Sequence, residues 1–186
     1  PLVFDKEIIQ MHFKNWIGAG RFLAFDFKEQ TPNPENKEVI TCWMHVWPVN
    51  TVSIEETQRL VAMAKNGKFY CLASGNTPLD VTFASFLDKM YRTNITGANI
   101  NLDHDYVIKG DHIAQVYYEN KFYEKVNAFY NETKDIKKVD YQRMQQLVTE
   151  KTDVYVVIIK NSSLADKLRK EALTFFSEKK RMGRNQ

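Results

Sequence analysis

The sequence has no long apolar run and only two cysteines. No stretch approaches the roughly 20 apolar residues that a membrane-spanning helix needs. The first residues also lack the basic and then apolar pattern of a secretory signal. We therefore expect a soluble protein of the cytoplasm or another intracellular compartment, with no membrane as a partner. Because Cys42 and Cys71 have neither CxxC spacing nor further thiol partners, we expect them to be buried free thiols.

Internal repeats and low-complexity stretches are absent as well, so no pattern divides the chain. Its 186 residues suit one domain, and 44% hydrophobic and 13% aromatic residues can fill one core. We predict a single domain over residues 1–186, with an amphipathic helix in 1–20 and a helix with a basic tail in 161–186. The opening Pro1 fits either removal of an initiator methionine or excision from a longer protein.

The net charge of +3 is mildly basic, and the excess lies at the C-terminus. It comes from Lys179, Lys180, Arg181 and Arg184. Such a tail favours an acidic partner, although a solvated and frayed chain end has the same composition.

Alternation and capping signals predict an α/β fold with a mixed sheet flanked by helices. Residues 21–29 alternate apolar and polar side chains, and residues 39–49 form a second apolar run. We expect these two segments to be strands paired as a hairpin. The capping box of Ser53 and Glu56 starts a helix, and residues 68–73 predict a buried strand.

The second half of the chain continues with further helices and strands. Pro78 favours a helix start. The apolar stripe expected to face the core on this helix consists of Leu79, Phe83, Phe86, Leu87 and Met90. A hairpin turn is predicted at Lys109–Gly110, a helix over 122–130 and a closing helix from Leu164. Residues 153–160 are rich in β-branched side chains and predict a strand.

Two groups of polar and aromatic residues could bind a ligand or could be structural. Trp43, His45 and Trp47 share a strand face that could stack a base, but such a stripe more often belongs to a core. The segment 103–112 contains two histidines and three aspartates, which could hold a metal ion. It also flanks the predicted hairpin turn, and turn chemistry explains these residues better.

Three aspartates fall on separate predicted elements. Asp26 lies within the first strand, Asp80 in the first turn of a helix, and Asp153 near the end of the chain. Carboxylates that converge from separate elements can hold paired Mg²⁺ or Mn²⁺ for phosphodiester cleavage, because hard cations prefer oxygen ligands. Most of the 23 acidic residues must be surface residues, so composition alone does not establish that these three converge.

Three segments resemble the motifs of DEDD 3′–5′ exonucleases, in particular the proofreading domain of protein-primed family B DNA polymerases. Residues 25–29 (FDFKE) are similar to the first motif, Asp-x-Glu. Residues 75–80 (GNTPLD), with Phe83 and Phe86 after them, resemble the second motif, His-Asn-x-x-Phe-Asp-x-x-Phe. Residues 151–154 (KTDV) would be the third. The resemblance covers about residues 21–160 and implies an RNase H-like fold.

The resemblance also implies roles for particular residues. It makes Asp26, Asp80 and Asp153 the catalytic residues and the ligands of Mg²⁺ or Mn²⁺. It places Asn76, Leu79 and Phe83 along the path of the 3′ end of a single strand of DNA or RNA.

The motifs depart from the family pattern at three positions. Lys28 stands where the family has its catalytic Glu, Thr149 where it has Tyr, and Gly75 where it has His. On a strand, Lys28 would share a face with Asp26 and place an ammonium group where a metal ion should bind. Glu29 would point to the opposite face unless a bulge intervenes. The pattern therefore favours the fold and disfavours full nuclease activity.

Three functions remain open from the sequence. The leading one is an exonuclease-like domain that handles single-stranded nucleic acid beside a DNA polymerase or another protein subunit, with nuclease activity impaired or lost and no metal cofactor. The second is an active metal-dependent 3′–5′ exonuclease in which Glu29 replaces the missing acid. The third is a structural or interaction subunit of a larger assembly. A two-metal site would bring the carboxylates of the three aspartates within about 4–7 Å of one another.

Overall fold

The computed structural model describes residues 7–47, 53–65, 67–89, 93–100 and 102–182. Val49 and Met90, which the sequence assigned to a strand and a helix, lie outside these ranges, as does Arg184 of the predicted basic tail. The described residues form a seven-stranded sheet in the order β1-β7-β6-β5-β2-β3-β4. The strands are β1 Ile8–Phe13, β2 Val39–Trp43, β3 Phe69–Ala73, β4 Thr93–Ile95, β5 Asp105–Lys109, β6 His112–Tyr118 and β7 Val154–Lys160.

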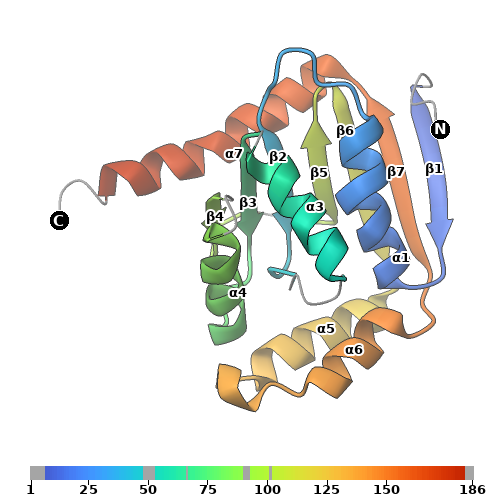
Figure 1. Cartoon of the computed structure of the whole chain (residues 1–186), viewed down its shortest axis with the longest axis vertical. Coiled ribbons are helices and arrows are strands. Elements are labelled where there is room, and N and C mark those ends of the chain that lie inside the picture. Colours follow the sequence, from blue (N-terminus) through green and yellow to red (C-terminus); the bar gives the residue numbers. More distant parts are fainter. Residues whose placement is uncertain (1–6, 48–52, 66, 90–92, 101, 183–186) are drawn as a thin grey trace.

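The sheet is mixed, because β2, β3 and β4 run parallel to one another while the other neighbouring pairs are antiparallel. Helices cover both of its faces (Figure 1). The helical elements are α1 Trp16–Arg21, the π-helix η1 Phe22–Phe27, α2 Lys28–Gln30, α3 Ile54–Lys65, α4 Pro78–Asp88, α5 Asn120–Glu132, the 3₁₀ turn η3 Ile136–Lys138, α6 Tyr141–Thr149 and α7 Ser162–Met182. The predicted α/β class with a mixed sheet flanked by helices is confirmed.

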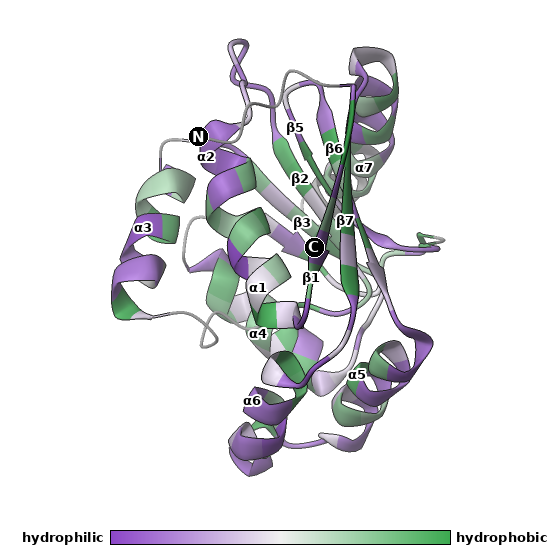
Figure 2. Ribbon diagram, turned by 90° about the vertical axis from the view of Figure 1, so that its right-hand side faces the viewer, coloured by the Kyte–Doolittle hydropathy of each residue, from purple (hydrophilic) through white to green (hydrophobic). Residues whose placement is uncertain are grey.

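The sheet separates two hydrophobic clusters. Helices α1, α3 and α4 lie on one face and α7 on the other, while α5 and α6 pack at one end (Figure 2). The larger cluster joins α1, α4, α5 and α6 to the first face. The smaller cluster lies between α7 and the opposite face, and it includes Cys42, Leu72 and Ile113. Among the described residues, no helix is long and apolar enough to cross a membrane.

The predicted helix over residues 1–20 is wrong in its central part. Residues 8–13 form the edge strand β1, which pairs antiparallel with β7. The alternation that decides this is visible in the burial pattern, in which Ile9, Met11 and Phe13 pack against the larger cluster. Apolar residues at every second position indicate a strand with one buried face. The C-terminal part of the segment is helical as predicted, because α1 begins at Trp16.

The predicted strand over residues 21–29 is also wrong, because this segment continues α1 as η1 and α2. Its apolar residues fit both the two-residue period of a strand and the spacing of one face of a helix. Phe22, Leu23, Phe25 and Phe27 are all buried, and an ordinary α-helix would turn some of them toward solvent. The wider π-type turn in this stretch re-aims the side chains and lets the helix bury all of them. The predicted hairpin with residues 39–49 is therefore absent, and β2 pairs with β3 and β5 instead.

Other predicted elements are confirmed. The Glu56 N–H donates to Ser53 Oγ (3.2 Å) and the Ser53 N–H donates to Glu56 Oε2 (3.0 Å), which is the capping box before α3. Strands β3 and β7 cover the predicted segments, α4 begins at Pro78, and β5 and β6 form the predicted hairpin. Cys42 and Cys71 are both buried.

The apolar stripe of α4 is confirmed only in part. Phe83 and Leu87 are buried, whereas Phe86 is 51% exposed. Asp80 and Ala84 occupy the buried face of α4 together with the apolar residues. The centre of the buried face is thereby rotated away from Phe86, because the side chain of Asp80 is bound inside the molecule.

A buried carboxylate joins the β5–β6 hairpin to the segment that follows β2. Asp105 Oδ1 accepts a hydrogen bond from the Met44 N–H, and Asp105 Oδ2 accepts one from the Tyr118 hydroxyl, both at 2.7 Å. Burial raises the pKa of Asp105 to about 6, although these two hydrogen bonds act in the opposite direction. The folded protein therefore holds this proton at pH values where an exposed Asp has lost it.

We predict that Asp105 makes folding less favourable as the pH rises from about 4 to 6. Its pKa is higher in the folded state than in the unfolded chain, so its favourable contribution is present at low pH and lost through this window. Asp105→Asn removes the titration. Urea unfolding at pH 4 and pH 7 should show the wild type losing stability relative to the variant by on the order of 2–3 kcal/mol. If the unfolding free energies of the wild type and the variant differ by the same amount at both pH values, Asp105 does not titrate between them.

Candidate functional site

The three aspartates predicted to hold a metal do not gather. Asp26 is exposed on η1, where its Oδ1 accepts a hydrogen bond from Gln30 (3.2 Å). Asp153 lies just before β7, and its Oδ1 is 2.6 Å from His12 Nε2 on β1. Asp80 is buried in α4. Within the described ranges, no group of three or more His, Cys, Asp or Glu side chains is placed to hold a metal ion.

Asp80 is instead the centre of a buried hydrogen-bond network. His45 Nδ1 lies 3.0 Å from Asp80 Oδ2, and the Val46 N–H donates to Asp80 Oδ1 (2.8 Å). The backbone and hydroxyl of Thr77 both donate to Asp80 Oδ2, which completes a capping box at the start of α4. Burial alone would raise the pKa of Asp80, but the hydrogen bonds from these partners lower it below its usual value.

The residues predicted to contact a nucleic-acid strand are also mostly structural. Leu79 and Phe83 are 1% and 9% exposed and belong to the larger hydrophobic cluster, so a bound strand could not reach them. Asn76 is exposed, and its Oδ1 accepts a hydrogen bond from the Thr96 hydroxyl (3.0 Å). His45 is 3% exposed and stacks on the Tyr130 ring, so it is not available to stack a base.

Gly75, which replaces the family histidine, is required by this network. A Cβ atom at position 75 would lie 2.5 Å from His45 Nδ1, 2.7 Å from Asp80 Oδ2 and 2.8 Å from the Met44 carbonyl oxygen. The backbone of residue 75 must therefore pass directly against the His45–Asp80 pair.

A different site lies at the opposite ends of the strands. The starts of β2 and β3 and the end of β5 surround a pocket of about 590 Å³. It is lined by Lys28, Glu29, Gln30, Thr31, Pro32, Asn33, Asn36, Lys37, Val39, Met63, Gly67, Lys68, Phe69 and Lys109. Because four of these residues are lysines and only one is acidic, we call it the lysine pocket.

Two of its lysines are drawn partly out of water. Lys28 lies on α2 rather than on a strand beside Asp26, and it is only 6% exposed. Its Nζ lies 5.5 Å from the centre of the Phe69 ring, a cation–π contact. Lys109 Nζ donates to the Lys28 carbonyl oxygen. Burial lowers the pKa of Lys109, and the charge of Glu29 acts in the opposite direction.

The charges around the lysine pocket are unevenly compensated. Lys37 Nζ lies within 4 Å of three carboxylates, those of Glu35 (3.2 Å), Asp166 (3.3 Å) and Asp111 (3.7 Å). Lys68 Nζ lies 3.6 Å from Glu38. Glu29 pairs with Arg59 outside the pocket. In the part of the chain that the structure describes, no carboxylate lies within ion-pairing distance of Lys109 Nζ. Lys109 is therefore the pocket lysine whose charge is not offset by a described carboxylate at ion-pairing distance.

The pocket is also preorganised by its backbone. Asn33 Oδ1 accepts the Lys37 N–H (3.0 Å) and Asn33 Nδ2 donates to the Lys37 carbonyl (2.9 Å), which closes the loop before β2. Gly110 packs so closely under this loop that a Cβ there would lie 2.2 Å from the Pro32 carbonyl oxygen. Thr31 Oγ1 is buried and has no hydrogen-bond partner among the residues that the structure describes, which is unusual for a buried hydroxyl.

Sequence reasoning missed this site because its residues are far apart along the chain. Lys28 and Lys109 are separated by 81 positions. The only local signal is that Lys37, Lys68 and Lys109 each stand at the end of a predicted strand or close to it.

Comparison with known proteins identifies the fold but no family. No protein-family model and no curated protein matches the chain. An archaeal chromatin protein, TrmBL2, described as showing a novel mode of DNA binding, has a similar structure with a TM-score of 0.50 and 8% sequence identity. The match covers 95% of this chain and 54% of TrmBL2, so the chain spans about half the length of that protein.

A second similar structure is Nuc from Salmonella typhimurium, a phospholipase D family member. Its TM-score is 0.52 at 10% identity, over 90% of this chain and 95% of that chain. At such low identity, both likenesses show the fold alone.

The space around Gly75 and Gly20 predicts that substitution by alanine has opposite effects on stability at these two positions. Gly75→Ala should destabilise the protein by about 1–3 kcal/mol, because the added methyl group forces the His45–Asp80 pair or the backbone to shift. Gly20→Ala is the matched control, since its Cβ would lie 3.6 Å from the Trp16 ring within a helix. We expect that change to be neutral or stabilising by up to about 1 kcal/mol. Thermal melting of both variants checks this, and equal melting temperatures would contradict it.

Proposed function

We propose that the lysine pocket binds phosphate groups of single-stranded nucleic acid and that the chain does not cleave them. The observation that carries the proposal is the charge of the pocket, in which four lysines and one carboxylate line about 590 Å³. Lysine ammonium groups are the usual partners of nucleic-acid phosphates.

The state of individual groups supports a phosphate ligand. Lys109 has lost part of its hydration through burial and lies near no described ion-pair partner, so a phosphate oxygen would offset the cost of its desolvation. The buried hydroxyl of Thr31 has no hydrogen-bond partner in the described part of the chain and could donate to the same oxygen atoms. A ligand of this kind would satisfy two groups that the protein alone leaves incompletely solvated.

The likeness to TrmBL2 points in the same direction, since that protein is described as binding DNA. A DNA polymerase or another subunit as a partner stays a prediction. An RNase H-like exonuclease site is not part of the proposal, because Asp26, Asp80 and Asp153 lie apart and Asp80 is occupied by structural hydrogen bonds.

We predict that a fluorescent single-stranded oligonucleotide binds and that its affinity falls as salt rises from about 50 to 200 mM, because bound phosphates release counterions. Lys109→Gln and Lys68→Gln should each weaken binding about two- to fivefold and reduce the slope of log affinity against log salt by about 0.7. Fluorescence anisotropy measures both quantities. The oligonucleotide should keep its full length when Mn²⁺ is added.

Lys121→Gln is the matched control, because Lys121 is exposed on α5, outside the lysine pocket. It should change affinity less than either pocket variant. An equal loss from all three variants would show diffuse attraction and overturn the location of the site. No binding at low salt would overturn the function and leave the interaction-subunit alternative, and shortening of the oligonucleotide would restore the exonuclease alternative.

A further inference from the structure

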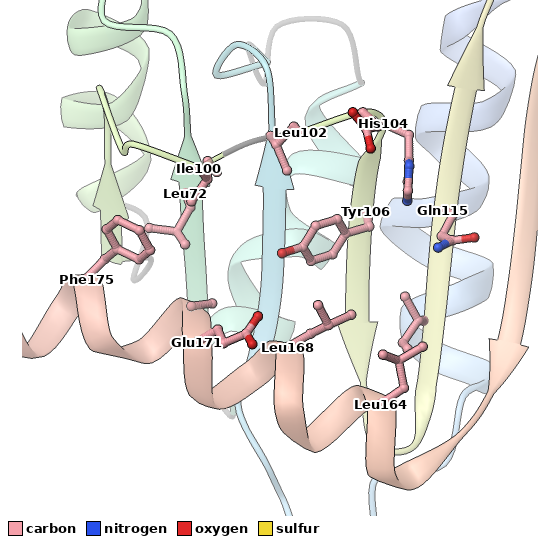
Figure 3. Close-up of a pocket in the computed structure, with 13 residues that line it drawn as sticks. Leu72, Ile100, Leu102, His104, Tyr106, Gln115, Leu164, Leu168, Glu171 and Phe175 are labelled. Carbon is pink, nitrogen blue, oxygen red and sulfur yellow. The ribbon is translucent and has the colours of Figure 1, made fainter.

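A second pocket of about 380 Å³ lies on the other face of the sheet, beneath α7. Figure 3 shows its walls, with Leu164, Leu168 and Phe175 projecting from α7 and Leu72 from β3. These apolar side chains line a partly open space between the helix and the sheet that suits a small molecule. The volume is within the range in which drug-sized ligands bind.

The polar groups of this pocket gather at the end where the chain enters β5. Tyr106 on β5 and Gln115 on β6 are directly paired in the sheet, and His104 lies just before them. Burial lowers the pKa of His104, against the opposing charge of Asp103, so the imidazole is neutral at pH 7. Burial also raises the pKa of Tyr106, so its hydroxyl keeps its proton. These groups offer hydrogen bonds without charge.

The charged groups of the pocket are both acidic. Asp103 and Glu171 line it, and no Lys or Arg is among the described residues that do. Glu171 projects from α7 toward the ring of Tyr106 in Figure 3. Its ion-pair partner among the described residues is Lys167, at 4.0 Å on the same helix, and the pair is weak because both side chains are more than half exposed. An anionic ligand would be repelled here, which distinguishes this pocket from the lysine pocket.

We propose that the pocket beneath α7 binds a small molecule with an apolar body and a protonated amine. The apolar body would replace water against Leu168 and Phe175, which is favourable in proportion to the area covered. The amine would lie near Glu171, and hydrogen bonds from the ligand could reach Tyr106 or Gln115. The pocket and its charge do not depend on the lysine pocket, so either site can exist without the other.

The test uses three probes of similar shape and different charge: tryptamine, 3-ethylindole and indole-3-propionate. Isothermal titration of the full chain at pH 7 and low salt should show tryptamine binding most tightly. Indole-3-propionate should bind about tenfold more weakly than tryptamine, because it reverses the sign of the interaction with both carboxylates. The neutral probe should fall between them. Equal affinities, or tighter binding of the acid, would overturn the proposal.

Two variants locate the binding. Glu171→Gln should weaken tryptamine about two- to fivefold and leave 3-ethylindole unchanged, whereas Glu124→Gln on α5 should affect neither probe. Leu168→Trp should abolish binding of all three probes by filling the pocket, with a melting curve to confirm that it folds. Unchanged tryptamine affinity in Glu171→Gln would overturn the charge assignment even if Leu168→Trp were unstable.

Discussion

The segment that follows β2 is bound by two buried carboxylates, those of Asp105 and Asp80. The arrangement of this end of the sheet depends on these contacts, which we call the carboxylate clamp. The Met44 N–H donates to Asp105, the Val46 N–H donates to Asp80, and the imidazole of His45 lies against Asp80. Hydrogen bonds to ionised groups are stronger than neutral ones, and loss of a partner would leave a buried charge unsatisfied. The clamp therefore fixes the β5–β6 hairpin, the loop after β2 and the start of α4 as one unit.

The carboxylate clamp lies at the ends of β2 and β3, where parallel strands often bind ligands, and a pocket of about 560 Å³ lined in part by His45, Gly75 and Asn127 opens beside it. The lysine pocket opens at the opposite strand ends, and the pocket beneath α7 lies on the other face of the sheet. The two are lined by charges of opposite sign. A phosphate that suits Lys109 would be repelled by Glu171, and an amine that suits Glu171 would be repelled by Lys109. The sheet thus separates two sites that would select different ligands.

The sequence was informative wherever a local signal acted alone. The capping box at Ser53, the helix start at Pro78 and the β-branched run of residues 154–160 each predicted the observed element. The sequence led to the wrong prediction for residues 21–29, because the apolar residues there fit both the alternation of a strand and the spacing of a helix. It could not reveal the lysine pocket, whose members come together only through the pairing of β2 with β3 and β5.

The predicted metal site fails for a reason that a sequence motif cannot show. A carboxylate offers about four lone-pair positions. Among the described residues, Asp80 has four hydrogen-bond partners: the Val46 N–H at Oδ1, the backbone N–H and the hydroxyl of Thr77 at Oδ2, and His45 Nδ1, which lies within 3.2 Å of both oxygens. A metal ion would have to displace partners that also cap α4 and hold the loop after β2. An acid in the first turn of a helix can thus resemble a metal ligand while all of its bonding capacity is used to build the fold.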